Sequence, residues 1–266
     1  MTTDKRVWEV IDDFQRRGLY GFERSRLEKT LSTTPAAGGK ALTRLAAKGR
    51  VKRILKDFYA ILPVEYSAQG MIPADWFLDD LMRSLALPYY MGLQSAAALY
   101  GAAHQQIQQV QIVTPRQVRG IERPGLSVRF FCKQSFGTTP LQSHKGHGGM
   151  LPVSTPEATA LDLLRYASQI GGLDAVITIL VELVEAMTPE KLAAAAAKES
   201  ELAQVQRLGW LLDHLNQSPL ADALQAALPT TRATLPRTRL DPAGEFAGPA
   251  RNRWKIIENA QPQSDL

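Results

Sequence analysis

Residues 33–62 read TTPAAGGKALTRLAAKGRVKRILKDFYAIL, and this stretch decides the fold that we expect for the first part of the chain. Thr34 followed by Pro35 is a strong helix start, because the threonine side chain accepts a hydrogen bond from one unpaired backbone amide and proline removes another. The apolar residues then keep helical spacing to about Lys48. The sequence therefore predicts a helix from about Pro35 to Lys48.

The two faces of this predicted helix differ in character. At about 100° per residue, one face carries small and apolar residues suited to packing, namely Gly38, Leu42, Leu45 and Gly49. The opposite face carries short and cationic residues, namely Ala36, Lys40, Thr43, Arg44 and Ala47. Short side chains permit a close approach to a DNA major groove, and cations reach phosphates or guanine edges. The second face therefore predicts a DNA-recognition helix.

A basic hairpin is predicted directly after this helix. Two short β-rich runs, 51–55 and 58–62, lie on either side of a turn at Lys56 and Asp57. A two-residue turn prefers glycine where the backbone is left-handed, and Asp57 is a tolerated substitute. A helix followed by such a hairpin is typical of a winged helix-turn-helix, in which the hairpin is the wing.

Two further helices are expected before this stretch. The first has apolar residues at helical spacing and stops at Arg16-Arg17-Gly18; these residues are Val7, Val10, Ile11 and Phe14. A short apolar link at 19–22 leads to a second helix with Ser25 as its cap and Glu28 in the reciprocal capping position. Three helices and a basic hairpin in this order predict a winged helix-turn-helix DNA-binding domain over residues 1–66.

The positive charge of the chain is concentrated in this predicted domain. Residues 1–66 hold 14 Lys and Arg against 8 Asp and Glu, whereas the remainder holds 17 against 18. Such a local excess suggests a polyanionic partner for the first domain alone. A solvated basic face without a partner, or a winged helix used only for protein contacts, are the alternatives. The predicted DNA-binding residues are Thr34, Lys40, Thr43, Arg44, Lys48, Arg50, Lys52, Arg53 and Lys56.

The remaining 200 residues predict a larger, helix-rich unit. A length of 266 residues suits two or three packed units, and the segment from Pro63 to Pro73 breaks the periodicity. We therefore predict an effector domain over 67–266. It divides into a small mixed α/β part at about 74–150, a helical part at about 151–228 and a basic, Pro-rich arm at about 229–266. The predicted fold class is α+β and predominantly helical.

Within this second unit, the expected strands and helices follow from periodicity and capping residues. Strands are expected at 110–114 and 126–133, and 137–149 has the composition of a loop. One helix is expected through Leu93, a second begins at a cap at Ser154 or Thr155, and a third spans 173–187. A fourth helix is expected to begin at Thr188-Pro189, and a fifth contains Val205 to Leu215.

The residues that could carry chemistry form no recognisable catalytic or metal-binding set. His144 and His147 lie in the predicted loop without a third ligand nearby, and Cys132 lies in an apolar predicted strand. The sequence contains no phosphate-binding loop, dinucleotide fingerprint, nucleophile elbow or zinc-protease helix. We therefore expect no catalytic residues, no enzyme activity, no cofactor and no metal ion.

The composition indicates a globular protein of a reducing compartment. Cys132 is the only cysteine, which excludes an intramolecular disulfide framework. The first residues lack the apolar core of an export signal, and no stretch has the roughly 20 apolar residues that a membrane span needs. We expect a cytoplasmic protein without a membrane partner.

A second basic cluster lies in the Pro-rich arm, and its role has two interpretations. It consists of Arg232, Arg237, Arg239, Arg251, Arg253 and Lys255. The arm either lies over the domain as an extended segment, which we favour, or binds an acidic partner or RNA.

Several segments together resemble the AbiEi-type antitoxins. RLAAKGRVKRILKDFYAIL at 44–62 is similar to the recognition-helix end and wing of that family, although Asp57 replaces its common wing glycine. LPYYMGLQSAA at 87–97 resembles the start of the family's second domain. STPEATALDLL at 154–164 resembles a helix start within it, and RWKIIEN at 253–259 resembles its closing segment.

This resemblance implies a role in a type IV toxin-antitoxin system of the kind used in phage defence. In that family the first domain represses the operon by binding inverted repeats in promoter DNA, and the second counteracts a nucleotidyltransferase-like toxin without a stable complex. The resemblance does not identify the toxin-neutralising residues. Two alternatives remain, a ligand-responsive winged-helix repressor without a toxin, and a nuclease-associated protein with a degenerate catalytic half.

Overall fold

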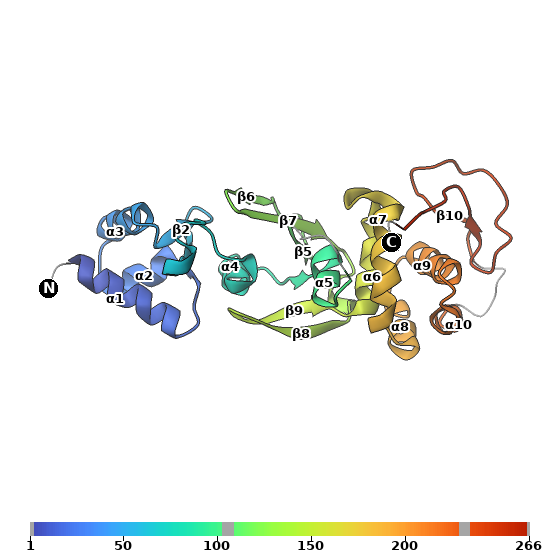
Figure 1. The fold of residues 1–266 in the computed structure, drawn as a ribbon, viewed down its shortest axis with the longest axis horizontal. Coiled ribbons are helices and arrows are strands. Elements are labelled where there is room, and N and C mark those ends of the chain that lie inside the picture. The colour runs from blue at the N-terminus through green and yellow to red at the C-terminus, as the bar shows by residue number, and fades with distance from the viewer. Residues whose placement is uncertain (1–2, 103–108, 229–234, 265–266) are drawn as a thin grey trace. The chain divides into compact units, whose positions relative to one another are not determined.

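The computed structural model describes residues 3–102, 109–228 and 235–264, and it is a mixed α+β protein with about 46% helix (Figure 1). The chain forms two compact units. Unit 1 comprises 1–89, 117–132 and 143–152, and unit 2 comprises 90–116, 133–142 and 153–266.

The N-terminal module, residues 3–62, packs three helices with a small antiparallel sheet. Its elements are α1 (Thr3–Arg16), β1 (Gly21–Glu23), α2 (Arg24–Leu31), α3 (Pro35–Ala47), β2 (Val51–Arg53) and β3 (Phe58–Ile61). The strand order is β1-β3-β2, with Gly21 opposite Ala60 and Arg53 opposite Tyr59. One apolar core joins all of these elements and includes Ile11, Phe22, Leu27, Leu42, Val51 and Ile61.

The helix that the opening stretch predicts is confirmed at its N-terminus and along its length. Thr34 caps α3, its hydroxyl oxygen accepts a hydrogen bond from the Ala37 amide at 3.4 Å, and Pro35 is the first helical residue. The first predicted helix is also confirmed, because α1 ends at Arg16 and Gly18 has a left-handed φ of 74°.

The predicted start of the second helix is wrong. Residues 21–23 are not a simple link but form β1, which pairs with β3. The Arg24 amide donates to the Asp57 carbonyl at 2.8 Å, so the sheet determines where α2 begins. Glu23 stands at the cap position without a side-chain cap bond, and Ser25 donates to the Glu23 carboxylate instead of capping the helix.

The predicted two-residue turn of the basic hairpin is also wrong. The strands β2 and β3 are joined by the four residues 54–57. The amides of Ile54 and Leu55 both donate to the Phe58 carbonyl and close this loop. Asp57 has no positive φ, so this loop does not require the glycine that a tight turn would need.

Beyond the N-terminal module, unit 1 contains one helix and two β-hairpin segments. The helix is α4 (Leu78–Ser84). In the first hairpin, β6 (Ile121–Arg123) pairs antiparallel with β7 (Leu126–Cys132). The second segment, residues 143–152, contains most of β8 (Leu141–Gly146) and β9 (Gly149–Ser154). The larger mixed sheet also includes β4 (Tyr90–Met91) and β5 (Val110–Thr114), and its strand order is β6-β7-β5-β4-β9-β8.

The interpretation of 137–149 as a loop is wrong, because β8 and β9 occupy most of it. Most β8 side chains are exposed, so the strand lacks the apolar alternation by which sequence patterns reveal strands. At its turn, His147 lies in an aromatic cluster instead of a metal site: its ring stacks on Trp76 with centroids 3.6 Å apart, and its Nε2 lies 3.2 Å from the Tyr20 hydroxyl.

The segment after residue 62 packs against the N-terminal module within unit 1. The Gly21 amide donates to the Asp80 carboxylate at 3.3 Å, and the rings of Phe58 and Phe77 lie 6.4 Å apart. Burial raises the pKa of the Asp80 carboxyl, and Arg83 partly opposes this rise.

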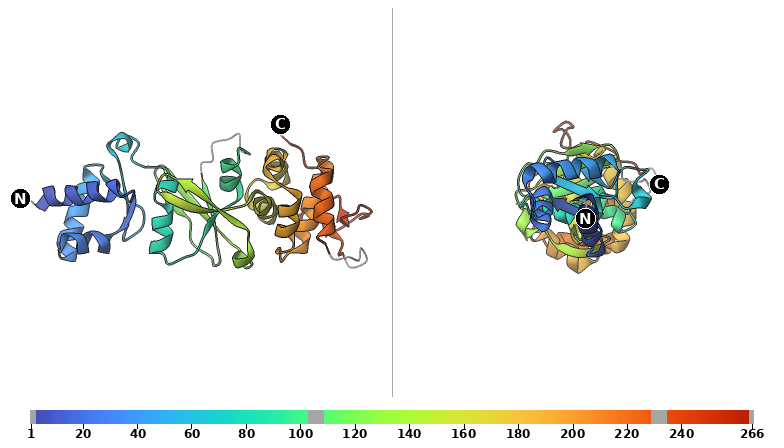
Figure 2. Two further views of the ribbon diagram at one scale, coloured as in Figure 1. Left: turned by 90° about the horizontal axis from the view of Figure 1, so that it is seen from below. Right: turned by 90° about the vertical axis from the view of Figure 1, so that its left-hand side faces the viewer.

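Unit 2 begins with two strands and the helix between them, and it continues as a group of helices followed by two short strands (Figure 2). Its elements are β4 (Tyr90–Met91), α5 (Leu93–Leu99), β5 (Val110–Thr114), α6 (Pro156–Arg165), α7 (Gly172–Leu183), α8 (Pro189–Ala196), α9 (Leu202–His214), α10 (Ser218–Ala226), β10 (Thr238–Arg239) and β11 (Ile256–Ile257). The predicted caps Thr155 and Thr188 are confirmed, since each side chain accepts an amide hydrogen bond. The predicted helix 173–187 is shorter, because α7 ends at Leu183 and a 3-10 turn follows.

The described part of the Pro-rich arm lies on α9. Trp254 is fully buried and a Cβ on Gly209 would come within 2.4 Å of its ring, so only glycine fits there. Arg253 forms ion pairs with Asp213 and Asp222, which neutralises it within the unit. Arg232 lies outside the described residues.

Among the described residues, none of the helices has the length and apolarity to cross a bilayer. The same residues contain no group of three or more His, Cys, Asp or Glu arranged to hold a metal ion.

Candidate nucleic-acid interface

The turn between α2 and α3 is fixed by contacts that bring the two helices close together. The Arg24 guanidinium donates to the Glu28 carboxylate at 2.6 Å and also to the Pro35 carbonyl. The hydrogen bond to Glu28 raises the pKa of Arg24 above its ordinary value. A Cβ on Gly38 would lie 2.6 Å from the Glu28 side chain, so the helices can approach this closely only at glycine. The turn therefore holds α3 in a defined orientation.

The exposed face of α3 carries the residues that the sequence places there. Ala41, Leu42 and Leu45 are buried in the core. The exposed residues are Ala36, Lys40, Thr43, Arg44 and Ala47, with Lys48 at the C-terminal cap. The Thr43 hydroxyl donates to the Gly39 carbonyl at 3.0 Å, so its hydrogen is used within the helix. Lys40 and Arg44 are the cations at the centre of this face.

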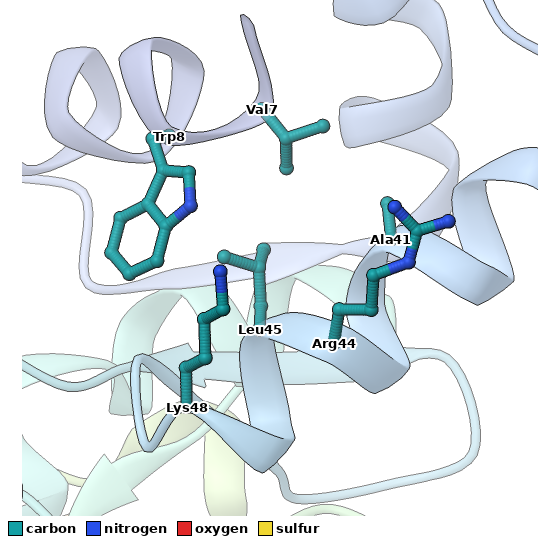
Figure 3. Close-up of a pocket in the computed structure, with 6 residues that line it drawn as sticks. All are labelled: Val7, Trp8, Ala41, Arg44, Leu45 and Lys48. Carbon is teal, nitrogen blue, oxygen red and sulfur yellow. The ribbon is translucent and has the colours of Figure 1, made fainter. Parts of the chain in front are cut away.

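Arg44 and Lys48 also line a shallow pocket toward α1 (Figure 3). Its other walls are Val7 and Trp8 from α1 and Ala41 and Leu45 from α3. The Lys48 ammonium lies 5.3 Å from the centroid of the Trp8 ring. Lys48 therefore lies on the flank of α3 that faces α1, a position suited to a phosphate beside the groove, whereas Arg44 lies between this flank and the exposed face.

Trp8 also contacts Arg50, another of the predicted DNA-binding residues. The Arg50 guanidinium lies 4.4 Å from the Trp8 ring centroid and donates to the Asp12 carboxylate at 2.9 Å. Its side chain is only 16% exposed. Arg50 is therefore held against α1 and is less open to a partner than Lys40 or Lys48. Trp8 itself was missed, because it stands next to Val7 outside the apolar spacing of the first helix.

The basic hairpin carries several cations, and one of them, Arg53, stabilises the loop between the two strands. Arg53 Nε donates to the carbonyls of Leu55 at 3.3 Å and Lys56 at 3.1 Å. Arg53 and Lys56 are exposed, and Lys52 is partly exposed. The nine predicted residues thus divide into an α3 group, Thr34, Lys40, Thr43, Arg44 and Lys48, and a hairpin group, Arg50, Lys52, Arg53 and Lys56. The arrangement can bind a polyanion through several separated cations.

The middle part of the chain matches a known family model. Residues 90–214 match the family model described as the AbiEi antitoxin C-terminal domain. The chain carries an AbiEi antitoxin C-terminal domain. This match confirms the family that the four sequence segments indicated.

The chain was also compared with solved structures. The crystal structure of RV2827C protein from Mycobacterium tuberculosis has a TM-score of 0.67 at 18% sequence identity, covering 97% of this chain and 90% of that one. This likeness shows a shared fold over nearly the whole chain. The crystal structure of an antigenic nucleotidyltransferase-like protein from Paracoccidioides brasiliensis has a TM-score of 0.37 at 17% identity, covering 56% of this chain and 89% of that one. A search of curated proteins gave no match.

Proposed function

We propose that this chain is the antitoxin of a type IV toxin-antitoxin system and that it also represses its own operon. The repression is assigned to residues 1–66, acting as a winged helix-turn-helix on inverted repeats in promoter DNA. The protection is assigned to residues 67–266, counteracting a nucleotidyltransferase-like toxin without a stable complex. The proposed setting is cytoplasmic phage defence.

One observation carries the DNA-binding half of the proposal. Helix α3 follows a fixed helix turn, buries one face in the core and leaves Lys40, Arg44 and Lys48 on its exposed side. Helix-turn-helix proteins place such a helix in the major groove, with adjacent elements on the backbone. The hairpin β2–β3 then acts as the wing, and its cations Lys52, Arg53 and Lys56 contact phosphates.

The antitoxin half of the proposal rests on the AbiEi domain. The family match covers 90–214, which includes the strands and helices from β4 to α9. We assign no catalytic residue, cofactor or metal ion to this part, and the toxin-neutralising residues are unknown. The proposed action is therefore functional antagonism of the toxin rather than chemistry at a site in this chain.

Two experiments test the halves separately. The purified full chain is titrated against its own promoter and a scrambled duplex of equal length; the proposal predicts preferential binding to the promoter. The chain is also co-expressed with the toxin encoded beside it, and the proposal predicts rescue of growth. Promoter binding without rescue would favour the ligand-responsive repressor, and absence of promoter binding would refute the repressor role.

A further inference from the structure

The loop of the wing lies beside a second hairpin of unit 1. Leu55 from the wing loop and residues 119–123, which lead into and form β6, line one cavity of about 470 Å³. The second hairpin, β6–β7, is outside the N-terminal module. It is nevertheless the neighbour of the wing loop within this unit.

The residues that this hairpin places at the cavity include two exposed arginines, Arg119 and Arg123. In the part of the chain that the structure describes, neither guanidinium forms an ion pair with an acid. Arg123 donates to the Glu122 main-chain carbonyl at 2.7 Å. The Glu122 carboxylate between them accepts a hydrogen bond from Ser127, its cross-strand neighbour, at 2.7 Å. Glu122 also lines the cavity, and its carboxylate is held by this bond to the neighbouring strand.

The hairpin holds these arginines in place through its own core. Ile121 is 4% exposed and lies opposite the fully buried Val128. At the tip, Gly125 has a left-handed φ of 79°, and a Cβ on it would lie 3.0 Å from Met71. The tip is therefore packed against the segment that follows the wing.

We propose that Arg119 and Arg123 extend the DNA-binding surface beyond the wing by contacting backbone phosphates. This inference rests on the proposed DNA-binding function. Phosphate contacts need cations placed along the duplex but no base-specific geometry, and a guanidinium is a good phosphate donor. Two exposed arginines beside the wing loop meet this requirement. The operator contact surface then includes a hairpin of the second predicted domain.

The salt dependence of binding by the full chain tests this proposal. Wild type and Arg119→Ala/Arg123→Ala are titrated against promoter and scrambled duplexes by fluorescence anisotropy between about 50 and 300 mM salt. The slope of log K against log salt is negative, and each lost phosphate contact makes it less steep by about 0.9. The slope of the double variant should therefore be less steep by about 1.8, and its binding at 0.1 M salt on the order of 60-fold weaker. The loss should be the same on both duplexes, and Arg119→Lys/Arg123→Lys should restore most of the slope.

A charge-matched control separates a contact from a general effect of charge. Arg16 and Arg17 are exposed at the end of α1 and pair with Asp13, so Arg16→Ala/Arg17→Ala removes the same charge elsewhere. A wild-type slope in the Arg119/Arg123 alanine variant, or an equal loss in the control, would overturn the inference while the proposed function stands. Absence of binding by the wild type would instead refute the proposed function, and this inference with it.

Discussion

The buried ion pair between Lys133 and Asp162 leads to a sharp prediction about the stability of unit 2. Lys133 Nζ lies 2.7 Å from Asp162 Oδ1, with the two side chains 4% and 0% exposed. The Tyr90 hydroxyl donates to the other carboxylate oxygen at 2.7 Å. Lys133→Met leaves the buried carboxylate with this hydroxyl but without its cation. Breaking a buried pair by removing one partner costs about 3–5 kcal/mol, so the free energy of unfolding should fall by that amount.

The pH dependence of this loss has a defined sign. Burial raises the pKa of the Asp162 carboxyl, and Lys133 opposes the rise, so Lys133→Met raises it further. An acid whose folded pKa exceeds its unfolded value binds more protons when folded, and the free energy of unfolding then falls as pH rises through that interval. The deficit of the variant should therefore be smaller at about pH 5 than at about pH 8.

Equilibrium urea unfolding followed by circular dichroism measures these differences. Lys198→Met is the matched control, because Lys198 and Lys133 line one small pocket but Lys198 is exposed. This control should change stability by less than about 0.5 kcal/mol. Lys133 Nζ also lies 3.7 Å from the buried Glu199 carboxylate, which keeps its ion pair with Arg165 in either variant. Combining Lys133→Met with Asp162→Leu therefore removes both charges of the Lys133–Asp162 pair and should recover most of the loss. A single variant within about 1 kcal/mol of wild type, or a double variant no better than the single, would refute the reasoning.

Three further predictions concern the proposed activities. Lys52→Ala with Lys56→Ala should weaken binding to promoter and scrambled DNA alike and make the salt dependence less steep by up to about 1.8 in slope. A changed base preference with an unchanged slope in the same titration would show that the wing reads sequence. Trp8→Leu should weaken promoter binding in a gel shift because Lys48 and Arg50 lose the ring that holds them; unchanged affinity would show that Trp8 only fills space. A fragment beginning at Gly70 lacks α1 to α3 and the wing, so it should fail to bind the promoter and, where circular dichroism shows that it is folded, retain part of the growth rescue; a folded fragment without rescue would mean that protection needs both halves.

Local sequence patterns predicted the end of α1 and the start of α3 in the N-terminal module, but not the start of α2. Thr34-Pro35 is a local signal, since the cap and the missing amide lie within one turn of each other, and α3 begins there. The strand β1 could not be predicted in the same way. Its formation depends on pairing with β3, which lies nearly 40 residues away, for example Gly21 opposite Ala60.

The contacts around the candidate site and within unit 2 were harder to predict. Trp8 became visible only when α1 and α3 were placed side by side, because its partners Lys48 and Arg50 are remote in sequence. Lys133 and Asp162 are charged residues that a pattern assigns to the surface, yet their pairing allows both to be buried. A sequence pattern records the polarity of a residue but not the partner that compensates its burial.

The most direct test of the central claim is promoter binding by the full chain with Lys40→Ala and Arg44→Ala on α3. Both residues are exposed on the face assigned to the major groove, and each base-directed contact is worth about 1–3 kcal/mol. We expect the double variant to keep the wild-type circular dichroism spectrum and to lose preferential binding to the promoter over the scrambled duplex. A folded double variant that binds the promoter with wild-type affinity and preference would show that α3 does not read the operator.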